Sequence, residues 1–339
     1  MNPGPLPRPS VRRCHASIAP IPLPPGEIPD HPAVRAWRSC RPSSPDPAGM
    51  EVLKDKLKSF VCRLQGVGPG EASVIAKRTH IRTARTERLI YEDVIPKLPL
   101  RSPRYFGSAP DDDPWFVWFF LEDVGEIPYA PSLPEHRRLA TRWLATLHTS
   151  GAAVAAPLGL ADRGPLYHAQ HLGLARTELG EAAAGLPLSP GDRALLHRLV
   201  SLLDAAESRW KLLQRLCEGT PATLLHADLK ENNVRIIRDG NGALFVPIDW
   251  EMAGLGAPAI DLAKCPDTAL YTELVRPHWP AMTRGRVERL RDVGLVFRPI
   301  SAICWEMSHL RPDSLQWSMP QLLSYGERLK NALERVDSW

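Results

Sequence analysis

The chain has 339 residues, of which 44% are hydrophobic and 24% are charged, an ordinary balance for a globular protein. This length is enough for two lobes or two domains. The formal net charge is +4, and residues 1–49 carry six arginines against three acidic groups, so most of the excess lies there. The charge therefore does not indicate a nucleic-acid partner. No apolar stretch approaches the roughly 18 residues of a membrane span, so a membrane partner is not expected either.

Prolines mark the start of the chain, where residues 1–49 hold thirteen of the 35. They also interrupt residues 17–25, so the continuous apolar segment of about 7–15 residues that a secretory signal needs is not present there. We therefore expect a Pro-rich disordered tail over 1–29, an N-lobe over 30–125 and a C-lobe over 126–339. Within 31–37 an apolar pattern indicates a segment that packs on the first lobe. The six cysteines form no CxxC pair or zinc spacing, which favours reduced thiols in the cytoplasm.

The next hundred residues alternate between strand and helix patterns. Residues 60–64 and 73–77 are short and rich in apolar or β-branched side chains, which predicts two strands. Gly66, Gly68 and Gly70 form the turn between them. A helical rhythm follows over 85–98, and the continuous apolar run 115–121 is typical of a buried strand.

The second half is mainly helical. Leu139, Trp143 and Leu147 follow helix spacing, and Ser189-Pro190 is a good start for a helix that runs to about Cys217. A hairpin is predicted from strands over 234–237 and 244–248 joined by a turn over 239–242. Two further helices are expected near 287–307 and 321–336.

Two segments of the second half carry the strongest chemical signal. Residues 226–233 read His-Ala-Asp-Leu-Lys-Glu-Asn-Asn, and Asp249 directly follows the second strand of the hairpin. An aspartate, an asparagine five residues later and an aspartate at a strand end are the set that phosphoryl transfer needs. One carboxylate orients and deprotonates an accepting hydroxyl, while an amide oxygen and the other carboxylate hold Mg²⁺ on a triphosphate. We expect Asp228 to be the catalytic base, and Asn233 and Asp249 to be metal ligands.

A candidate nucleotide-binding pair lies in the first half. Lys77 ends the second strand, in the place of a lysine that grips the α- and β-phosphates of ATP. Glu87, ten residues later and near the start of a helix, is its expected ion-pair partner. Glu92, one turn further along, is the rival partner. We prefer Glu87 because the partner must lie on the helix face toward the strand.

Other segments of the first half could complete a nucleotide site. Gly66 and Gly68, with Gly70, could cover phosphates through backbone N–H groups, although a plain hairpin turn explains them equally well. Glu122 and Asp123 follow a buried strand, where backbone groups can read an adenine edge. Their side chains could instead face the acceptor or solvent, and that choice is open.

Four residues near the chemical segments need a separate interpretation. We expect His226 to hold the loop through backbone hydrogen bonds. We also expect Asp261, twelve residues after Asp249, to tie that loop by accepting backbone N–H bonds. Trp250 is expected to pack. Glu251 is open between a metal or acceptor ligand and a solvated role.

These segments resemble the aminoglycoside phosphotransferase and choline kinase-like family, which shares the protein kinase fold. The matching segments are residues 225–234, 246–251 and 260–263, with weaker matches at 74–77, Glu87 with Tyr91, 121–123 and 145–148. The resemblance covers about residues 50–335. It implies an α+β, bilobal protein kinase-like fold, with a small β-rich N-lobe, a larger mainly helical C-lobe and ATP in the cleft. Ala227 stands where the family usually has Gly, and residues 230–232 also depart from it, so we expect a less tightly turned loop.

The resemblance implies a small-molecule kinase that uses ATP, or GTP, with Mg²⁺ to phosphorylate a hydroxyl of a small acceptor, as aminoglycoside phosphotransferases do. A choline-, ethanolamine- or sugar-type kinase is the alternative. A nucleotide-binding pseudokinase or interaction module is a further one, but Asp228, Asn233, Asp249 and Lys77 are all present. A protein kinase is disfavoured because 11 residues between Asp249 and Asp261 leave little room for an activation segment. Monomer and homodimer are equally compatible.

The acceptor itself stays open at this level. A polycationic aminoglycoside would need an acidic pocket, for which the candidates are Asp267, Glu273 and Glu306. Arginines crowd the same region, namely Arg276, Arg284, Arg286, Arg289 and Arg291. A choline-like cation would instead need an aromatic cage, for which the candidates are Trp250, Tyr271, Trp279, Trp305 and Trp317.

Overall fold

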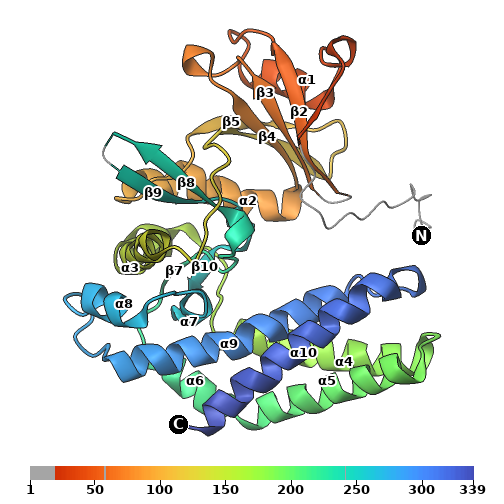
Figure 1. Ribbon diagram of the computed structural model, residues 1–339, viewed down its shortest axis with the longest axis vertical. Helices are drawn as coiled ribbons and strands as arrows, with labels where there is room; N and C mark the ends of the chain where they lie inside the picture. Colours follow the sequence, from red (N-terminus) through yellow and green to blue (C-terminus); the bar gives the residue numbers. More distant parts are fainter. Residues whose placement is uncertain (1–19, 57–58, 241) are drawn as a thin grey trace. The chain divides into compact units, whose positions relative to one another are not determined.

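The computed structural model describes residues 20–56, 59–240 and 242–339, which divide into two compact units (Figure 1). Unit 1 contains the described residues of 1–92 and 102–126, and unit 2 contains 93–101 and the described residues of 127–339. Unit 1 is built on a β-sheet and unit 2 is mainly helical, which confirms the predicted α+β class. No helix in the described part of the chain is long and apolar enough to cross a membrane.

The sheet of unit 1 has six strands in the order β1-β2-β3-β4-β6-β5, and every neighbouring pair is antiparallel. Their bounds are β1 Ile21–Pro22, β2 Gly49–Lys56, β3 Ser59–Gln65, β4 Val74–His80, β5 Tyr105–Pro110 and β6 Phe116–Glu122. The strands predicted over 60–64, 73–77 and 115–121 are β3, β4 and β6. The pairings of β4 place Val74 opposite Glu122 and Lys77 opposite Phe119.

The Pro-rich start of the chain differs in part from its prediction as a tail. Residues 1–19 lie outside the described residues. Residues 20–29 are ordered: Ile21 pairs with Val52 in the sheet, and Leu23 N–H donates to Met50 O over 2.9 Å. The prediction of disorder is wrong for this stretch because proline is tolerated at a sheet edge, where one side of the strand needs no donors.

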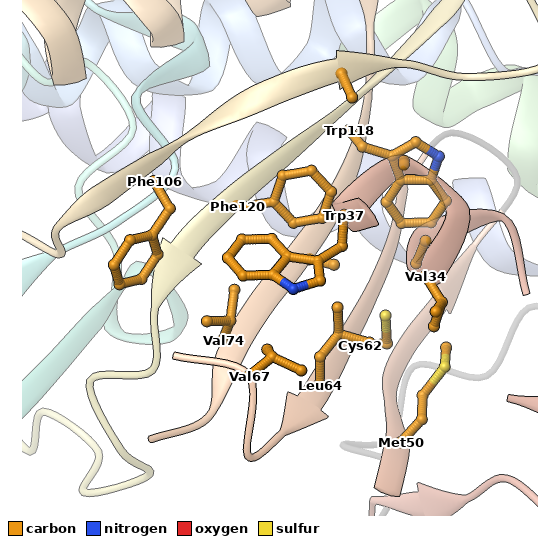
Figure 2. Close-up of a cluster of buried hydrophobic side chains, with 14 of the residues drawn as sticks. Val34, Trp37, Met50, Cys62, Leu64, Val67, Val74, Phe106, Trp118 and Phe120 are labelled. Atoms are coloured by element: carbon orange, nitrogen blue, oxygen red, sulfur yellow. The ribbon is translucent and has the colours of Figure 1, made fainter. Parts of the chain in front are cut away.

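Helix α1 (Pro32–Cys40) supplies much of the core of unit 1, as its apolar pattern indicated. Its Pro32 occupies the first helical position, and His31 Nδ1 accepts the Ala33 N–H over 3.1 Å, so the helix begins there. Figure 2 shows Trp37 among the side chains of the sheet. Its ring centroid lies 5.0 Å from that of Phe120 and 6.2 Å from that of Phe106.

Helix α2 (Ile81–Leu89) follows β4 directly and carries Glu87. The sequence predicted this helix to start at residue 85, four residues too late. The earlier start follows from His80, whose Nδ1 accepts the Arg82 N–H over 3.1 Å and caps the helix. A π-helical turn over Ile90–Val94 and a 3-10 turn over Ile95–Lys97 complete the predicted segment.

Unit 2 contains helices of very different lengths around two small sheets (Figure 1). The helices are α3 Pro134–Ala155, α4 Pro165–Gly185, α5 Pro190–Ser208, α6 Trp210–Glu218, α7 Ala259–Leu262, α8 Thr268–Val275, α9 Arg284–Met307 and α10 Leu315–Asp337. One sheet pairs β7 (Thr223–Leu225) with β10 (Gly254–Gly256), and the other is the predicted hairpin of β8 (Val234–Asp239) and β9 (Gly242–Pro247). Helix α9 packs against α10, α4 and α7.

The helix predicted from Ser189 to about Cys217 is two helices. Ser189 caps α5 as expected, accepting the Asp192 N–H over 3.1 Å. The break falls at Arg209, whose φ of −98° and ψ of 0° end α5 and start α6. Apolar spacing continues across the break, so periodicity alone could not reveal it.

Candidate active site

The segment 226–233 of unit 2 runs from the end of β7 to the start of β8 and is fixed at both ends. Asn233 O accepts the Ile248 N–H over 2.8 Å, and His226 Nε2 lies 3.2 Å from Ile248 O. Ile248 immediately precedes Asp249. The two hydrogen bonds therefore hold the end of strand β9 beside the loop, so that Asp228, Asn233 and Asp249 belong to one small region.

Asp228 is at the centre of the loop's polar contacts. Its Oδ2 accepts from Lys230 Nζ over 2.6 Å and from Asn233 Nδ2 over 2.9 Å. Asn233 Nδ2 also reaches Asp228 O over 3.1 Å. The Asp228 side chain keeps 15% exposure, so it can still meet a ligand. Because the Asn233 amide nitrogen is committed to Asp228, its Oδ1 is the atom left to act as a metal ligand.

The loop keeps a tight turn despite its departures from the family pattern. Ala227 has a φ of +63°, in the left-handed region that favours glycine. Glu231–Asn233 form a single 3-10 turn, closed by the Asn233 N–H donating to Lys230 O over 2.9 Å. The less tightly turned loop that we expected is therefore not found.

Asp261, at the start of the short helix α7, enforces this geometry. It is fully buried, and its two oxygens accept the backbone N–H groups of His226 over 2.8 Å and Ala227 over 2.9 Å. His148 Nε2 lies 3.4 Å from Oδ2. Burial opposes ionisation, but the hydrogen bonds from His148 and the backbone lower the pKa of the Asp261 carboxyl below its usual value. The prediction that Asp261 ties the loop is confirmed.

His226 and Trp250 pack as expected. Both are fully buried, and their ring centroids lie 4.5 Å apart. Burial lowers the pKa of His226, although the carboxylates of Asp261, Asp228 and Asp249 act against this. A neutral imidazole bonded to Ile248 O fits a structural role rather than proton transfer.

Asp249 follows β9, as predicted, and has a φ of +71° and a ψ of 63°. Its carboxylate and Asn233 Oδ1 are oxygen atoms of the hard type that Mg²⁺ prefers as ligands. No group of three His, Cys, Asp or Glu side chains in the described part of the chain could hold a metal by itself. Such a two-ligand set fits an ion that takes its remaining ligands from phosphates and water.

Unit 1 holds the predicted lysine pair. Lys77 Nζ lies 2.9 Å from Glu87 Oε1 and 2.8 Å from Oε2, and Glu87 is fully buried. The rival, Glu92, lies 3.7 Å from Arg88 instead. The structure therefore pairs Lys77 with Glu87, the partner that the sequence favoured.

The glycines of unit 1 are explained by the turn between β3 and β4. Gly66 has a φ of +77° and Gly70 a φ of +64°, while a Cβ on Gly68 would lie 2.9 Å from Ala72 O. Gly68 N–H donates to that same oxygen over 2.8 Å. The turn requires all three glycines, so they give no independent sign of a phosphate site.

The side chains of Glu122 and Asp123 are both used inside unit 1. Glu122 Oε2 accepts the Arg104 N–H over 2.9 Å, and Asp123 Oδ2 accepts from Arg63 Nε over 2.5 Å. Asp123 Oδ1 also accepts the Gly125 N–H over 3.1 Å. The Glu122 backbone N–H is used as well, because it donates to Arg104 O over 2.8 Å.

A cavity of about 660 Å³ lies within unit 2 and includes Asp228 in its lining. Helices α9 and α10, which run side by side, form much of its wall (Figure 1). Of the acceptor-binding candidates, only Trp305 and Glu306 line it. Trp250 and Tyr271 are fully buried in the core, and Asp267 caps α8 by accepting the Leu270 N–H over 2.9 Å.

The arginines singled out in the sequence do not line this cavity, and others do. The basic lining residues are Lys230, Lys264, Arg298, Arg328 and Arg335. They come from the loop, from the residues that follow α7 and from the consecutive helices α9 and α10. No spacing within one segment could have grouped them, because only the tertiary packing brings them together.

Comparisons with known proteins agree with this geometry. The model of the phosphotransferase enzyme family matches residues 59–291, more than half of the chain. No sequence match to a curated protein was found.

Similar folds occur in three solved structures at 13–16% identity. A choline kinase from Cryptosporidium parvum has a TM-score of 0.56 at 13% identity, over 86% of this chain and 93% of that one. The macrolide 2'-phosphotransferase MphH from Brachybacterium faecium has a TM-score of 0.54 at 16% identity, over 88% and 98%. An aminoglycoside phosphotransferase in complex with AMP-PNP and hygromycin B has a TM-score of 0.53 at 13% identity, over 87% and 97%. The fold is thus the kinase-like one that was expected, and the chain belongs to the phosphotransferase enzyme family.

Proposed function

We propose that this protein is a small-molecule kinase that moves the γ-phosphoryl group of ATP to a hydroxyl group of a small acceptor. The observation that carries the proposal is the placement of Asp228, whose carboxylate is held by Lys230 and Asn233 and lines a cavity of about 660 Å³. A cavity of this size suits a small molecule. The AMP-PNP in one of the similar structures supports an adenine nucleotide as the donor.

Asp228 acts as the base in the proposed reaction. The acceptor hydroxyl donates its hydrogen bond to the Asp228 carboxylate, which takes the proton as the acceptor oxygen bonds to phosphorus and the bond from phosphorus to the ADP oxygen breaks. Lys230, 2.6 Å from Asp228, supplies a positive charge beside the reacting groups. Asp261 acts only through the loop, since both its oxygens are taken by backbone N–H groups.

The remaining predicted residues would bind the nucleotide and its metal. Asn233 Oδ1 and the Asp249 carboxylate would hold Mg²⁺, which neutralises the triphosphate charge when bound. Lys77, oriented by Glu87, would bind the α- and β-phosphates. For the segments that contain Gly66, Gly68, Glu122 and Asp123 we propose backbone contacts with the nucleotide. These contacts would not use the N–H groups of Gly68 and Glu122, which already donate to Ala72 O and Arg104 O.

The cysteines support a reducing compartment such as the cytoplasm. The free thiols among the described residues are Cys40, Cys62, Cys217, Cys265 and Cys304. Burial raises the pKa of Cys265 and of Cys304 to about 11, so these thiols are protonated near neutral pH.

The test is acceptor-dependent release of ADP or GDP from the purified full chain with Mg²⁺ and either ATP or GTP. The acceptors are aminoglycosides, macrolides, choline, ethanolamine, sugars and hydroxy acids. Asp228→Asn should lower kcat by about 10²–10⁴, the usual contribution of a general base. Asp313→Asn, a change at an exposed aspartate in the 3-10 turn Pro312–Ser314, is the matched control and should leave kcat unchanged. Turnover that Asp228→Asn leaves intact would overturn the proposal.

A further inference from the structure

The cavity that contains Asp228 is strongly basic. Its lining has five basic residues, which are Lys230, Lys264, Arg298, Arg328 and Arg335. Against them stand two acidic residues, Asp228 and Glu306. The chain outside residues 1–49 is almost neutral in total. The excess of positive charge at this cavity is therefore a local feature and does not follow from the total charge of the chain.

Two of the five basic residues already have acidic partners. Lys230 Nζ lies 2.6 Å from Asp228, and Arg335 Nε lies 2.8 Å from Asp292 Oδ1. The other three, Lys264, Arg298 and Arg328, have no carboxylate within 4.0 Å among the described residues. We call these three the basic cluster.

Arg298 is the least satisfied member of the basic cluster. Its Nη1 is buried and has no hydrogen-bond partner in the described part of the chain. Its Nη2 reaches only Leu229 O, over 3.4 Å. A buried N–H donor without an acceptor is costly, since it has lost its hydrogen bonds to water and gained none in exchange. This atom is the natural contact for a ligand with a charged oxygen.

The members of the basic cluster also lie close enough to repel one another. Burial lowers the pKa of Lys264, and the charges of Arg298 and Arg328 lower it further, while the carboxylates of Glu231 and Asp228 act against this. Burial likewise lowers the pKa of Arg298; Asp228 and Asp261 act against this, and Arg328 adds to the lowering. The three like charges therefore weaken one another at the cavity, and an anion between them would offset their repulsion.

We propose that the acceptor is a hydroxylated anion, whose carboxylate or phosphate is bound by Lys264, Arg298 and Arg328 while its hydroxyl reaches Asp228. Arginine suits this task because its planar fork matches two oxygens of a carboxylate or phosphate at once. A polycation such as an aminoglycoside, or a choline-like cation, would bring positive charge against the cluster. This inference rests on the proposed function, since it names the acceptor class of the same site.

The first test measures binding and does not depend on turnover. The full chain, saturated with Mg²⁺ and AMP-PNP, is titrated calorimetrically with matched compounds. These are glycerol, glycerate and glycerol 3-phosphate, then glucose, gluconate and glucose 6-phosphate, with choline as the cation. We expect at least one anion to bind at least tenfold more tightly than its neutral parent. Comparison of the affinities of the carboxylates with those of the phosphates identifies the preferred head group. No preference for any anion over its neutral parent would overturn the inference.

Matched substitutions on one helix distinguish a direct contact of the basic cluster with the anion from a long-range effect of the protein's charge. Arg328→Gln should weaken anion binding at least tenfold. Lys330→Gln removes a positive charge two residues away on α10, where Lys330 is exposed, lies outside the cavity and pairs with Glu334 at 3.7 Å. It should leave binding unchanged. Equal effects of the two substitutions would show only a long-range field and would overturn the proposed contact.

Steady-state kinetics separate the failure of this inference from the failure of the proposed function. If the inference holds, Lys264→Gln and Arg328→Gln raise the KM of the acceptor and leave the KM of ATP unchanged. A rise in the KM of ATP alone would mean that the cluster binds nucleotide phosphates. Turnover of only neutral or cationic acceptors would keep the kinase and overturn the acceptor class. Anion binding without any turnover would keep the anion site and count against the kinase.

Discussion

Replacing Asp261 with asparagine tests how the loop around Asp228 is held. The two carboxylate oxygens accept different backbone N–H groups, from Ala227 at 2.9 Å and His226 at 2.8 Å, and the site is fully buried. Asparagine offers one oxygen and one NH₂ group, so one of the two N–H groups loses its acceptor. An unsatisfied buried donor costs about 1–3 kcal/mol. The surviving bond loses its charge, worth about 1 kcal/mol more, because charge-assisted bonds are about twice as strong.

Asp261→Asn should therefore lower the free energy of unfolding by about 2–4 kcal/mol. Urea unfolding followed by tryptophan fluorescence measures this value, with Asp313→Asn as an exposed control expected to stay within about 0.5 kcal/mol. The kcat should fall as well, since Asp228 follows directly after the two anchored residues. A variant within about 1 kcal/mol of the parent, with normal kcat, would refute the idea that Asp261 fixes the loop.

The difference in unfolding free energy between the parent and Asp261→Asn should also depend on pH, and the direction of this dependence can be predicted. The folded protein lowers the pKa of Asp261 below that of the unfolded chain, which is about 3.9. The resulting stabilisation is complete above pH about 4 and is lost as the pH falls through the folded pKa. The stability difference between parent and Asp261→Asn should thus be constant near neutral pH and shrink below pH about 4. A difference that grows on acidification would contradict this assignment.

Three further substitutions test other parts of the structure. Ala227→Gly removes the strain of an alanine in the left-handed region, which costs about 1–2 kcal/mol. The substitution also removes a buried methyl group and raises the conformational entropy of the unfolded chain, and these two losses are together of similar size. Its unfolding free energy should stay within about 1 kcal/mol of the parent, and a loss above about 2 kcal/mol in urea would contradict the role of the positive φ. Glu87→Gln removes the buried negative charge that lies 2.8 Å from the little-exposed Lys77, so we expect about 3 kcal/mol lower stability and at least a tenfold higher KM for ATP, whereas Glu92→Gln should change neither. Trp37→Ala creates a cavity in the core of unit 1 and should lower the free energy of unfolding by about 3–5 kcal/mol, measured in a thermal or urea melt. Trp115→Ala, at a side chain that is 59% exposed, should lower it by less than about 0.5 kcal/mol.

The parts of the fold that the sequence predicts well depend on local patterns. The β8–β9 hairpin follows from a turn between two apolar runs, and α9 and α10 follow from apolar spacing over more than twenty residues. The spacing of five between Asp228 and Asn233 is a property of one loop and survives into the structure as a hydrogen bond of 2.9 Å. Lys77 and Glu87 are ten residues apart, but a strand and the helix next to it are enough to join them.

The parts that the sequence could not predict depend on packing between distant segments. Helix α4 has glycines at positions 173 and 180 and a start without a side-chain cap, so its local signal is weak. Composition made residues 20–29 look disordered, yet their pairing with β2 orders them. The basic cluster joins α7, α9 and α10, and no motif links Lys264 to Arg298 or Arg328. The sequence therefore indicated phosphoryl transfer, but the arginines that it singled out near the acidic candidates do not line the cavity.

The proline of strand β1 has a consequence for solubility. This strand is the outer edge of the six-stranded sheet, and Pro22 within it has no N–H to offer to another strand. Behind it lies β2, eight residues long, which would form an open edge if β1 were missing. Long uncovered edges invite pairing between molecules and hence aggregation. The residues whose composition predicted a disordered tail thus cover the edge of the sheet, and a chain that starts at Glu27, which keeps α1 but lacks β1, should aggregate at concentrations at which the longer chain stays dispersed.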